Sequence, residues 1–340
     1  MTTALTGLNL TLPVIAAPMS GGPTTVAMVI AAHRAGGLGF LATGYKTPEA
    51  VQAELDALRE ESLPFGVNVF VPNPTPIQPE RYRRYSTAMQ AEADRFGVTL
   101  PAEPVDSDDS FNAKIELLLA HPAPVVSFTF GIPPVDVIRK LQAAGSVVAQ
   151  TVTCRGEAMI AAAAGADALV VQATTAGGHS GTFTPERPPE PLPIGELVAS
   201  VTNAVDLPVI AAGGLGTAAD IAEVLRAGAS AAAVGTVLLL ADESGASATH
   251  QAALQDSRRT ETVVTHAFTG RPARGLRNRF TDTYTATAPY GYPALHFLTS
   301  PLRKAAAAAG DPELVHLWAG TGHRHARREP TEQILRRLAP

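Results

Sequence analysis

Residues 208–217 read PVIAAGGLGT, and this stretch decides the fold. Its first half, residues 208–212, is apolar without polar alternation, which is typical of a strand buried on both faces of a parallel sheet. Three glycines follow within the next four residues, and residues 217–227 then favour a helix. The stretch predicts one β/α unit with a glycine-rich turn between strand and helix.

Seven more short apolar runs repeat this pattern along the chain. The predicted strands are residues 14–17, 38–42, 66–70, 125–129, 147–151, 168–172, 208–212 and 231–235. The predicted helices between and after them are residues 24–35, 48–61, 111–120, 134–143, 155–164, 195–204 and 217–227. Eight β/α alternations in about 240 residues predict a TIM (β/α)8 barrel, an α/β fold.

The chain has 340 residues, more than the barrel needs. Residues 71–110 form a long insertion after the third strand, because four prolines near its start forbid a regular element and a charged, helix-like run follows at 81–95. We expect residues 1–241 to form the barrel and residues 242–310 a smaller, mostly helical cap domain over its mouth. Residues 311–340 are expected to be a C-terminal helical segment that returns to the barrel.

Composition excludes several classes of protein. The net charge of −5 gives no field that attracts nucleic acid, and the single cysteine, Cys154, excludes an internal disulfide framework. The amino terminus lacks the basic start of a signal peptide, and no apolar run reaches the ~18 residues of a membrane span. We therefore expect a cytoplasmic protein that binds neither nucleic acid nor membrane.

The active site of a TIM barrel lies at the carboxyl ends of its strands, and phosphates commonly bind after strands 7 and 8. Gly213 and Gly214 follow the seventh strand, and Gly235 and Thr236 follow the eighth. Their backbone N–H groups predict a phosphate cup at the start of the next helix. Two alternatives are a simple tight turn and a Rossmann site, but the acid that a Rossmann site needs about 20 residues further on is missing.

His179 is the candidate catalytic residue, because it lies among glycines directly after the sixth strand. Glycine lets the backbone approach a planar ligand closely, and imidazole titrates near neutral pH. The alternative is a surface or capping histidine. Ser180 lacks the G-x-S-x-G context of a nucleophile, and Cys154 is interpreted as a small buried thiol.

Several segments in order resemble the nitronate monooxygenases, formerly called 2-nitropropane dioxygenases. They are PVIAAPMSGG (13–22), GGLGFLATGYK (36–46), GVN (66–68), AGGHSG (176–181), AAGGLG (211–216), AVGT (233–236) and AFTGRPARGLRNRF (267–280). The similarity spans almost the whole chain. The wider superfamily, including flavin-dependent enoyl-acyl-carrier-protein reductases and quinone reductases, shares some of these segments.

The resemblance implies FMN in the barrel mouth and His179 as the active-site histidine. The residues implied to contact the cofactor are Pro18, Met19, Asn68, Gln172, Gly177, Gly178, Gly213, Gly214, Ala233, Val234, Gly235 and Thr236. Tyr292 and His296 lie in a stretch that reaches over the flavin in relatives, so they are candidate substrate contacts. No residue is expected to bind a metal.

The implied reaction is FMN-dependent oxidation of an alkyl nitronate, such as propionate 3-nitronate, or of a nitroalkane, by O₂ to a carbonyl compound and nitrite. His179 would bind the nitronate as imidazolium or, as neutral imidazole, abstract the α-proton of a nitroalkane. Two rival interpretations stay open. One is an NAD(P)H-dependent flavin reductase of enoyl thioesters or quinones, and the other is a non-catalytic flavin-binding module. The sequence does not predict the oligomeric state.

Overall fold

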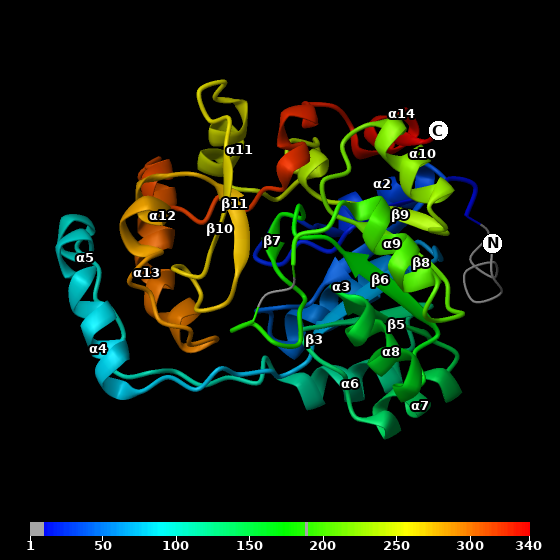
Figure 1. Ribbon diagram of the computed structural model, residues 1–340, viewed down its shortest axis with the longest axis horizontal. Coiled ribbons are helices and arrows are strands. Elements are labelled where there is room, and N and C mark those ends of the chain that lie inside the picture. Colours follow the sequence, from blue (N-terminus) through cyan, green and yellow to red (C-terminus); the bar gives the residue numbers. More distant parts are fainter. Residues whose placement is uncertain (1–9, 188–189) are drawn as a thin grey trace.

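A closed barrel of eight parallel strands forms one half of the molecule, which a computed structural model describes for residues 10–187 and 190–340 (Figure 1). Around the barrel the order is β1 (Val14–Ala16), β2 (Leu38–Ala42), β3 (Gly66–Phe70), β4 (Val125–Thr129), β5 (Val147–Val152), β6 (Ala168–Gln172), β8 (Val209–Ala212) and β9 (Ala231–Val234). Each predicted strand is confirmed to within one residue at either end. The predicted TIM barrel is therefore confirmed.

Seven helices lie outside the strands, at the predicted positions. They are α2 (Val26–Arg34), α3 (Pro48–Glu60), α6 (Phe111–Ala120), α7 (Val135–Ala143), α8 (Arg155–Ala164), α9 (Ile194–Thr202) and α10 (Ala218–Arg226). Threonines begin three of these helices, because the hydroxyls of Thr25, Thr47 and Thr217 accept hydrogen bonds from backbone N–H groups of the first turn. Among the described residues, no helix is long and apolar enough to cross a membrane.

The insertion contains two helices, α4 (Pro79–Ala88) and α5 (Gln90–Phe96), where the sequence suggested one run. The break falls at Met89, whose N–H donates to Ser86 O at 3.1 Å, a 3₁₀-type bond that ends α4. Both helices lie at the outer edge of the cap, far from the barrel (Figure 1). Tyr82, Tyr85 and Met89 are buried there in the same apolar cluster as Phe280 and Leu298.

The helices of the cap are α11 (Ala248–Gln255), α12 (Arg279–Tyr284) and α13 (Ala294–Ala308), and the 3₁₀ turns η1 (Thr236–Leu238), η2 (Pro312–Leu314) and η3 (Thr321–His325) lie nearby.

The cap also contains a small sheet that the sequence did not predict. The sheet has the order β10 (Thr262–Thr265), β11 (Ala273–Leu276) and β7 (Gly178–His179), all antiparallel. Since β7 belongs to the loop after β6, this sheet ties the barrel mouth to the cap.

The last helix, α14 (Thr331–Leu338), lies against the barrel, where Ile334, Leu335 and Leu338 are fully buried in the cluster that holds Val14. The division into residues 1–241, 242–310 and 311–340 stays a prediction. The insertion helices share the apolar core of the cap, although they precede it by more than 150 residues in the chain.

A buried ion pair anchors the end of the insertion beside the barrel mouth. The ammonium of Lys114, which is 0% exposed, lies 2.7 Å from the Asp109 carboxylate and donates to Thr43 O at 3.0 Å. The other oxygen of Asp109 accepts the N–H of Tyr45 at 2.8 Å. Burial raises the pKa of Asp109 and lowers that of Lys114, so each charge depends on its partner.

Replacing Lys114 by Met should lower the free energy of unfolding by on the order of 3 kcal/mol, because the carboxylate of Asp109 would stay buried without its partner. The matched control is Lys140→Met, which removes an exposed pair with Asp136 and should change stability by at most about 0.5 kcal/mol. Urea unfolding of both variants measures the difference. Equal effects would show that the buried pair does not stabilise the fold.

Candidate active site

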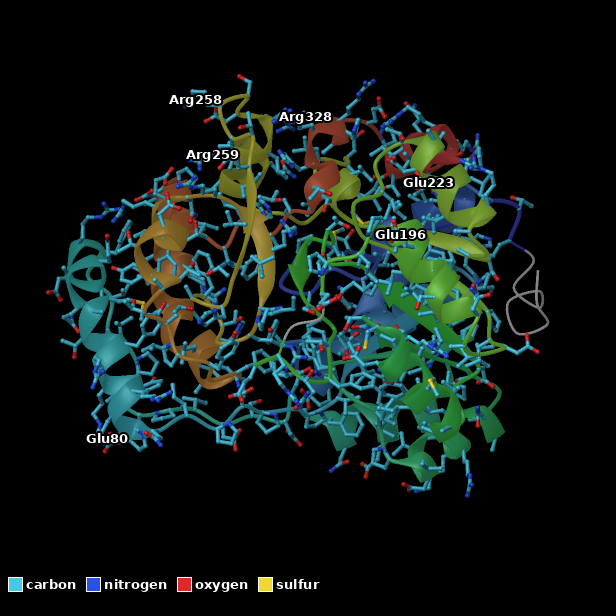
Figure 2. All side chains as sticks on the ribbon, in the orientation of Figure 1. Glu80, Glu196, Glu223, Arg258, Arg259 and Arg328 are labelled. Atoms are coloured by element: carbon cyan, nitrogen blue, oxygen red, sulfur yellow. The ribbon has the colours of Figure 1, made fainter. Side chains whose placement is uncertain are left out.

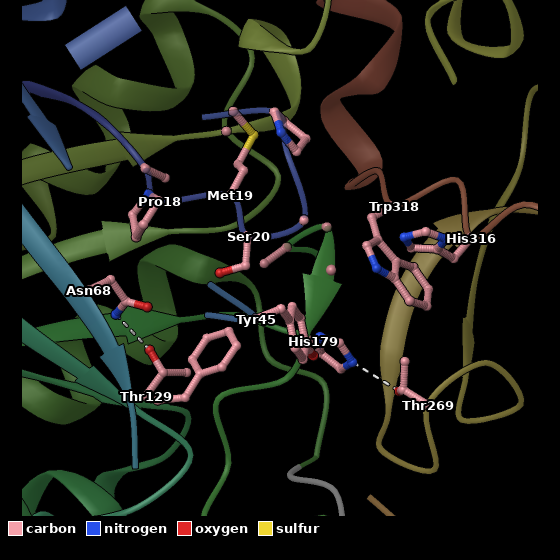
Figure 3. A pocket seen from close by; sticks show the side chains of 18 of the residues that line it. Pro18, Met19, Ser20, Tyr45, Asn68, Thr129, His179, Thr269, His316 and Trp318 are labelled. Atoms are coloured by element: carbon pink, nitrogen blue, oxygen red, sulfur yellow. Dashed lines mark hydrogen bonds between the residues drawn. The ribbon is translucent and has the colours of Figure 1, made fainter. Parts of the chain in front are cut away.

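A cavity of about 840 Å³ lies between the carboxyl ends of the barrel strands and the cap (Figure 3). Most of the predicted site residues line it, from strands β3, β6, β7 and β9, from the loops after β1, β6, β8 and β9, and from the start of α13. They are Pro18, Met19, Asn68, Gln172, Gly177, Gly178, His179, Gly213, Gly214, Ala233, Gly235, Thr236, Tyr292 and His296. Val234 does not line the cavity, because its side chain is buried in the apolar cluster outside the barrel.

The two predicted glycine loops meet at one end of this cavity. Gly213 and Gly214 adopt φ angles of 115° and 78°, which only glycine tolerates well. Within residues 10–187 and 190–340, the N–H groups of Gly214, Gly235 and Thr236 donate to no other group of the chain. These donors suit an anion.

The start of α10 is less open than the sequence suggested. The Asp220 carboxylate accepts the N–H groups of Gly216 and Thr217 at 2.9 and 2.8 Å, in a capping box with Thr217. Because the Asp220 carboxylate already accepts the N–H groups at the start of α10, an anion in the cup would not bind them. It would contact the glycine turn and the start of η1 instead.

The C-terminal segment closes the cup from the cap side. Gly320 N–H donates to the hydroxyl oxygen of Thr236 at 2.9 Å. A Cβ on Gly177 would lie 2.5 Å from Gly320 N, so the two backbones touch where no side chain fits. Sequence reasoning did not identify Gly320, because nothing near it marks a strand end.

Amide side chains line the barrel side of the cavity. Asn68 donates from Nδ2 to the hydroxyl oxygens of Ser127 at 2.9 Å and Thr129 at 3.0 Å (Figure 3). Gln172 accepts Gly181 N–H at 2.7 Å and donates to His179 O at 3.1 Å. Gln172 therefore fixes the loop that carries His179 as well as lining the cavity.

His179 lies in β7, paired with Ala273 of β11, and its ring points into the space beside Trp318 (Figure 3). Its Nε2 lies 2.9 Å from the hydroxyl of Thr269. One arrangement satisfies both contacts of this hydroxyl: its hydrogen goes to Arg271 O at 3.2 Å, its oxygen accepts from His179, and Nε2 carries the proton. Nδ1 is then a lone-pair acceptor with no partner among the described residues.

The surroundings of His179 hold it neutral. Burial among the rings of Phe130, Tyr292 and Trp318 lowers its pKa to about 3, and the positive charges of Arg271 and Arg303 add to this shift. Of the two roles considered for this histidine, the neutral imidazole fits this environment and the imidazolium does not.

Sequence reasoning missed two buried arginines near the cavity. Arg271 is 0% exposed, donates to the carbonyls of Ser180 and Thr182, and stacks 4.0 Å from the Phe130 ring centre. Arg303 lines the cavity from α13. A signal existed for Arg303, since it shares the helical stripe of Leu295, Thr299, Leu302 and Ala306, all of which are buried.

The fold and the cavity define an enzyme of the TIM-barrel class with a cluster of backbone N–H donors and a neutral histidine at its mouth. The family model described as nitronate monooxygenase matches residues 2–340. The chain therefore belongs to the nitronate monooxygenase family, and it is a flavin-dependent oxidoreductase.

Individual relatives agree with this assignment. A probable nitronate monooxygenase of Staphylococcus aureus (strain Newman) is 35% identical, covering 96% of this chain and 93% of that protein. The nitroalkane oxidase of Streptomyces ansochromogenes is 45% identical with a TM-score of 0.93, covering 99% and 96% of the two chains. FabK of Thermotoga maritima, at 24% identity, a TM-score of 0.76 and coverage of 99% and 95%, shares the fold.

Stability should fall as the pH is lowered from about 7 toward 4. Burial lowers the pKa of His179 to about 3 and that of His250 to about 4, and it also lowers those of His296 and His316. Below the ordinary value near 6.5 the unfolded chain binds protons that the folded chain does not, so each histidine removes up to about 1.4 kcal/mol per pH unit.

Urea unfolding at several pH values measures this slope. His250→Gln should make the dependence of the free energy of unfolding on pH shallower, by the contribution of about one bound proton. A free energy of unfolding that stays constant or rises between pH 7 and pH 5 would contradict the burial of neutral histidines.

Proposed function

We propose that this enzyme oxidises alkyl nitronates with FMN and O₂ to a carbonyl compound and nitrite, and that it also accepts neutral nitroalkanes. The observation that carries the proposal is His179, held neutral in the same cavity as the cup, where its Nδ1 and the N–H groups of the cup have no partner among the described residues. The relatives named as a nitronate monooxygenase and a nitroalkane oxidase support this substrate class.

The cup and the amide wall fit FMN. The N–H groups of Gly214, Gly235 and Thr236 would hold its phosphate, with Gly177, Gly178, Gly213 and Ala233 beside them. Val234, whose side chain points away from the cavity, would not contact it. Asn68 and Gln172 would bond the ring, which Pro18 and Met19 would contact along the opposite wall. Bound there, FMN would accept electrons from the substrate and return them to O₂.

His179 would act on the substrate as a hydrogen-bond acceptor and base. Its Nδ1 takes the α-proton of a neutral nitroalkane, and the Thr269 hydroxyl keeps the opposite nitrogen protonated. A preformed nitronate needs no such transfer. Tyr292, whose ring lies 5.8 Å from that of His179, and His296 complete the proposed substrate pocket.

A cytoplasmic location is part of this proposal. Cys154 is unpaired, as expected of a chain that folds in a reducing compartment. The cavity takes a small molecule and O₂ as its partners.

Mixing the purified enzyme with propionate 3-nitronate under air, while recording oxygen and nitrite, tests the function. We expect oxygen consumption, nitrite release, and a flavin that heat sets free and mass spectrometry identifies as FMN. Rapid anaerobic flavin reduction by NADH or NADPH, with no reaction toward nitronates, would move the assignment to the flavin reductases. A bound flavin that reacts with neither would support the non-catalytic module.

His179→Asn should lower turnover of a neutral nitroalkane by roughly 10²–10⁴-fold, because general base catalysis contributes about this much. Turnover of a preformed nitronate should fall less, since no proton is removed from carbon. FMN content and thermal melting are measured alongside and should stay close to those of the wild type. Equal losses on both substrates would remove proton abstraction from the role of His179.

Gly214→Asp should weaken FMN binding by on the order of 3 kcal/mol, because a carboxylate would lie beside the phosphate. Gly145→Asp is the matched control. Gly145 also has a positive φ, of 94°, but its side-chain position is open, and it does not line the cavity. Fluorescence titration of the flavin-free variants with FMN compares the two. Equal FMN affinities would place the phosphate elsewhere.

A further inference from the structure

Glu157 is a buried carboxylate that binds the loop after His179. It is the third residue of α8 and only 6% exposed. One of its oxygens accepts the backbone N–H and the hydroxyl of Thr153 at 2.6 and 2.7 Å, as expected of an acid near the start of a helix. The other oxygen accepts the hydroxyl of Thr182 and the backbone N–H of Phe183, both at 2.7 Å. Helix capping therefore accounts for one oxygen, and the second oxygen holds the loop.

Arg271 binds the same loop from the side of the cap. Its guanidinium donates to the carbonyls of Ser180 and Thr182. Thr182 thus accepts from the arginine through its carbonyl and donates to the carboxylate of Glu157 through its hydroxyl. Because Glu157 belongs to the barrel and Arg271 to the cap, Thr182 links the two halves of the molecule three residues after His179.

The carboxylate of Glu157 also balances the buried charge of Arg271. Burial lowers the pKa of Arg271 to about 10, and Tyr292, Tyr45 and Glu157 oppose this shift. Burial raises the pKa of each of the two tyrosines, so both are neutral at pH 7. Glu157, which accepts four hydrogen bonds, is the charged member of the three. A buried guanidinium and a buried carboxylate are therefore linked through Thr182, and each makes the burial of the other less costly.

Both functions of Glu157 affect proton acceptance by His179. The hydroxyl of Thr269, which contacts His179 Nε2, also contacts the carbonyl of Arg271, so a shift of Arg271 moves the ring. The charge of Arg271 adds to the lowering of the His179 pKa that burial causes. Without the carboxylate this charge would be unbalanced, and the imidazole would be a still weaker base. A substrate that is already deprotonated needs no base, so neither effect reaches its oxidation through this step.

We propose that Glu157 is a positioning residue for His179, acting through Thr182 and Arg271 on proton abstraction from neutral nitroalkanes. This inference rests on the proposed function for the step that it affects. Glu157 is not among the described residues that line the cavity, so its role is to hold and balance the groups that do the chemistry.

The ratio of kcat/KM for nitroethane to kcat/KM for its nitronate isolates the proton transfer, because a loss of folded enzyme lowers both values equally. Glu157→Gln keeps the shape of the side chain but removes the charge and replaces one acceptor by a donor. It should lower the ratio by roughly 100-fold, since a small displacement of a catalytic group costs about this much. Thr182→Val, which removes the hydroxyl at nearly constant volume, should lower the ratio by roughly tenfold.

Two matched controls should keep the ratio of the wild type. Thr182→Ser retains the hydroxyl that binds Glu157. Glu196 is the third residue of α9, as Glu157 is of α8, but it is exposed on the outside of the barrel (Figure 2). Glu196→Gln therefore makes the same chemical change at the same place in a helix without touching the loop after His179.

The ring of His179 provides a readout without turnover. ¹⁵N NMR of the histidine-labelled wild type should show one neutral form with the hydrogen on Nε2. Glu157→Gln and Thr182→Val should show a mixture of the two neutral tautomers, because the ring is no longer held against Thr269. The two control variants should give the signal of the wild type.

The outcomes separate this inference from the proposed function. A ratio that Glu157→Gln leaves unchanged, or that Glu196→Gln lowers equally, would overturn the positioning role and leave the proposed function intact. If Glu157→Gln does not fold, Thr182→Val decides in the same way. If the wild type oxidises neither substrate, the proposed function fails and the NMR signal decides alone. A mixture of tautomers confined to Glu157→Gln and Thr182→Val would then support the positioning role, and an unchanged signal would overturn it.

Discussion

The pairing of β7 with β11 is the constraint on which the site depends. Two residues of a barrel loop, Gly178 and His179, join a sheet that otherwise belongs to the cap. Gln172 fixes the same loop from the barrel side through both ends of its amide. The histidine is thereby held between the two halves of the molecule, so its ring direction depends on how the cap sits over the barrel mouth.

Buried arginines provide the second organising feature. Arg271 holds the backbone after β7 through the carbonyls of Ser180 and Thr182. Burial lowers the pKa of the adjacent His179, and the charge of Arg271 adds to this shift. Burial likewise lowers the pKa values of His296 and His316, and the charge of Arg303 adds to both shifts. Arg303 lines the cavity, and Arg271 lies behind it against the ring of Phe130, which does line it. Their positive charge favours an anionic substrate and disfavours positively charged histidines, so the two effects are linked.

The sequence predicted the barrel because its signals are local. Continuous apolar runs and glycine turns occur within single β/α units, and the strands end where these runs end. The carboxyl-end rule then brought His179, Gly214 and Gly235 together. The cap sheet was missed because β7 is two residues long and its partner lies more than 90 residues away. Thr269 and Arg271 were missed for the same reason, since only the folded chain brings them close to His179. Arg303 was missed although its helical stripe of buried residues gave a local signal.

The protonation of the His179 ring tests this account most directly. ¹⁵N NMR of the flavin-loaded enzyme labelled at histidine, with His179→Asn to assign the signal, distinguishes the two ring nitrogens. We predict a neutral ring at pH 7 with the proton on Nε2 and an unprotonated Nδ1. A signal from imidazolium, or from a ring protonated at Nδ1, would contradict the role assigned to Thr269 and the proton acceptor placed in the cavity.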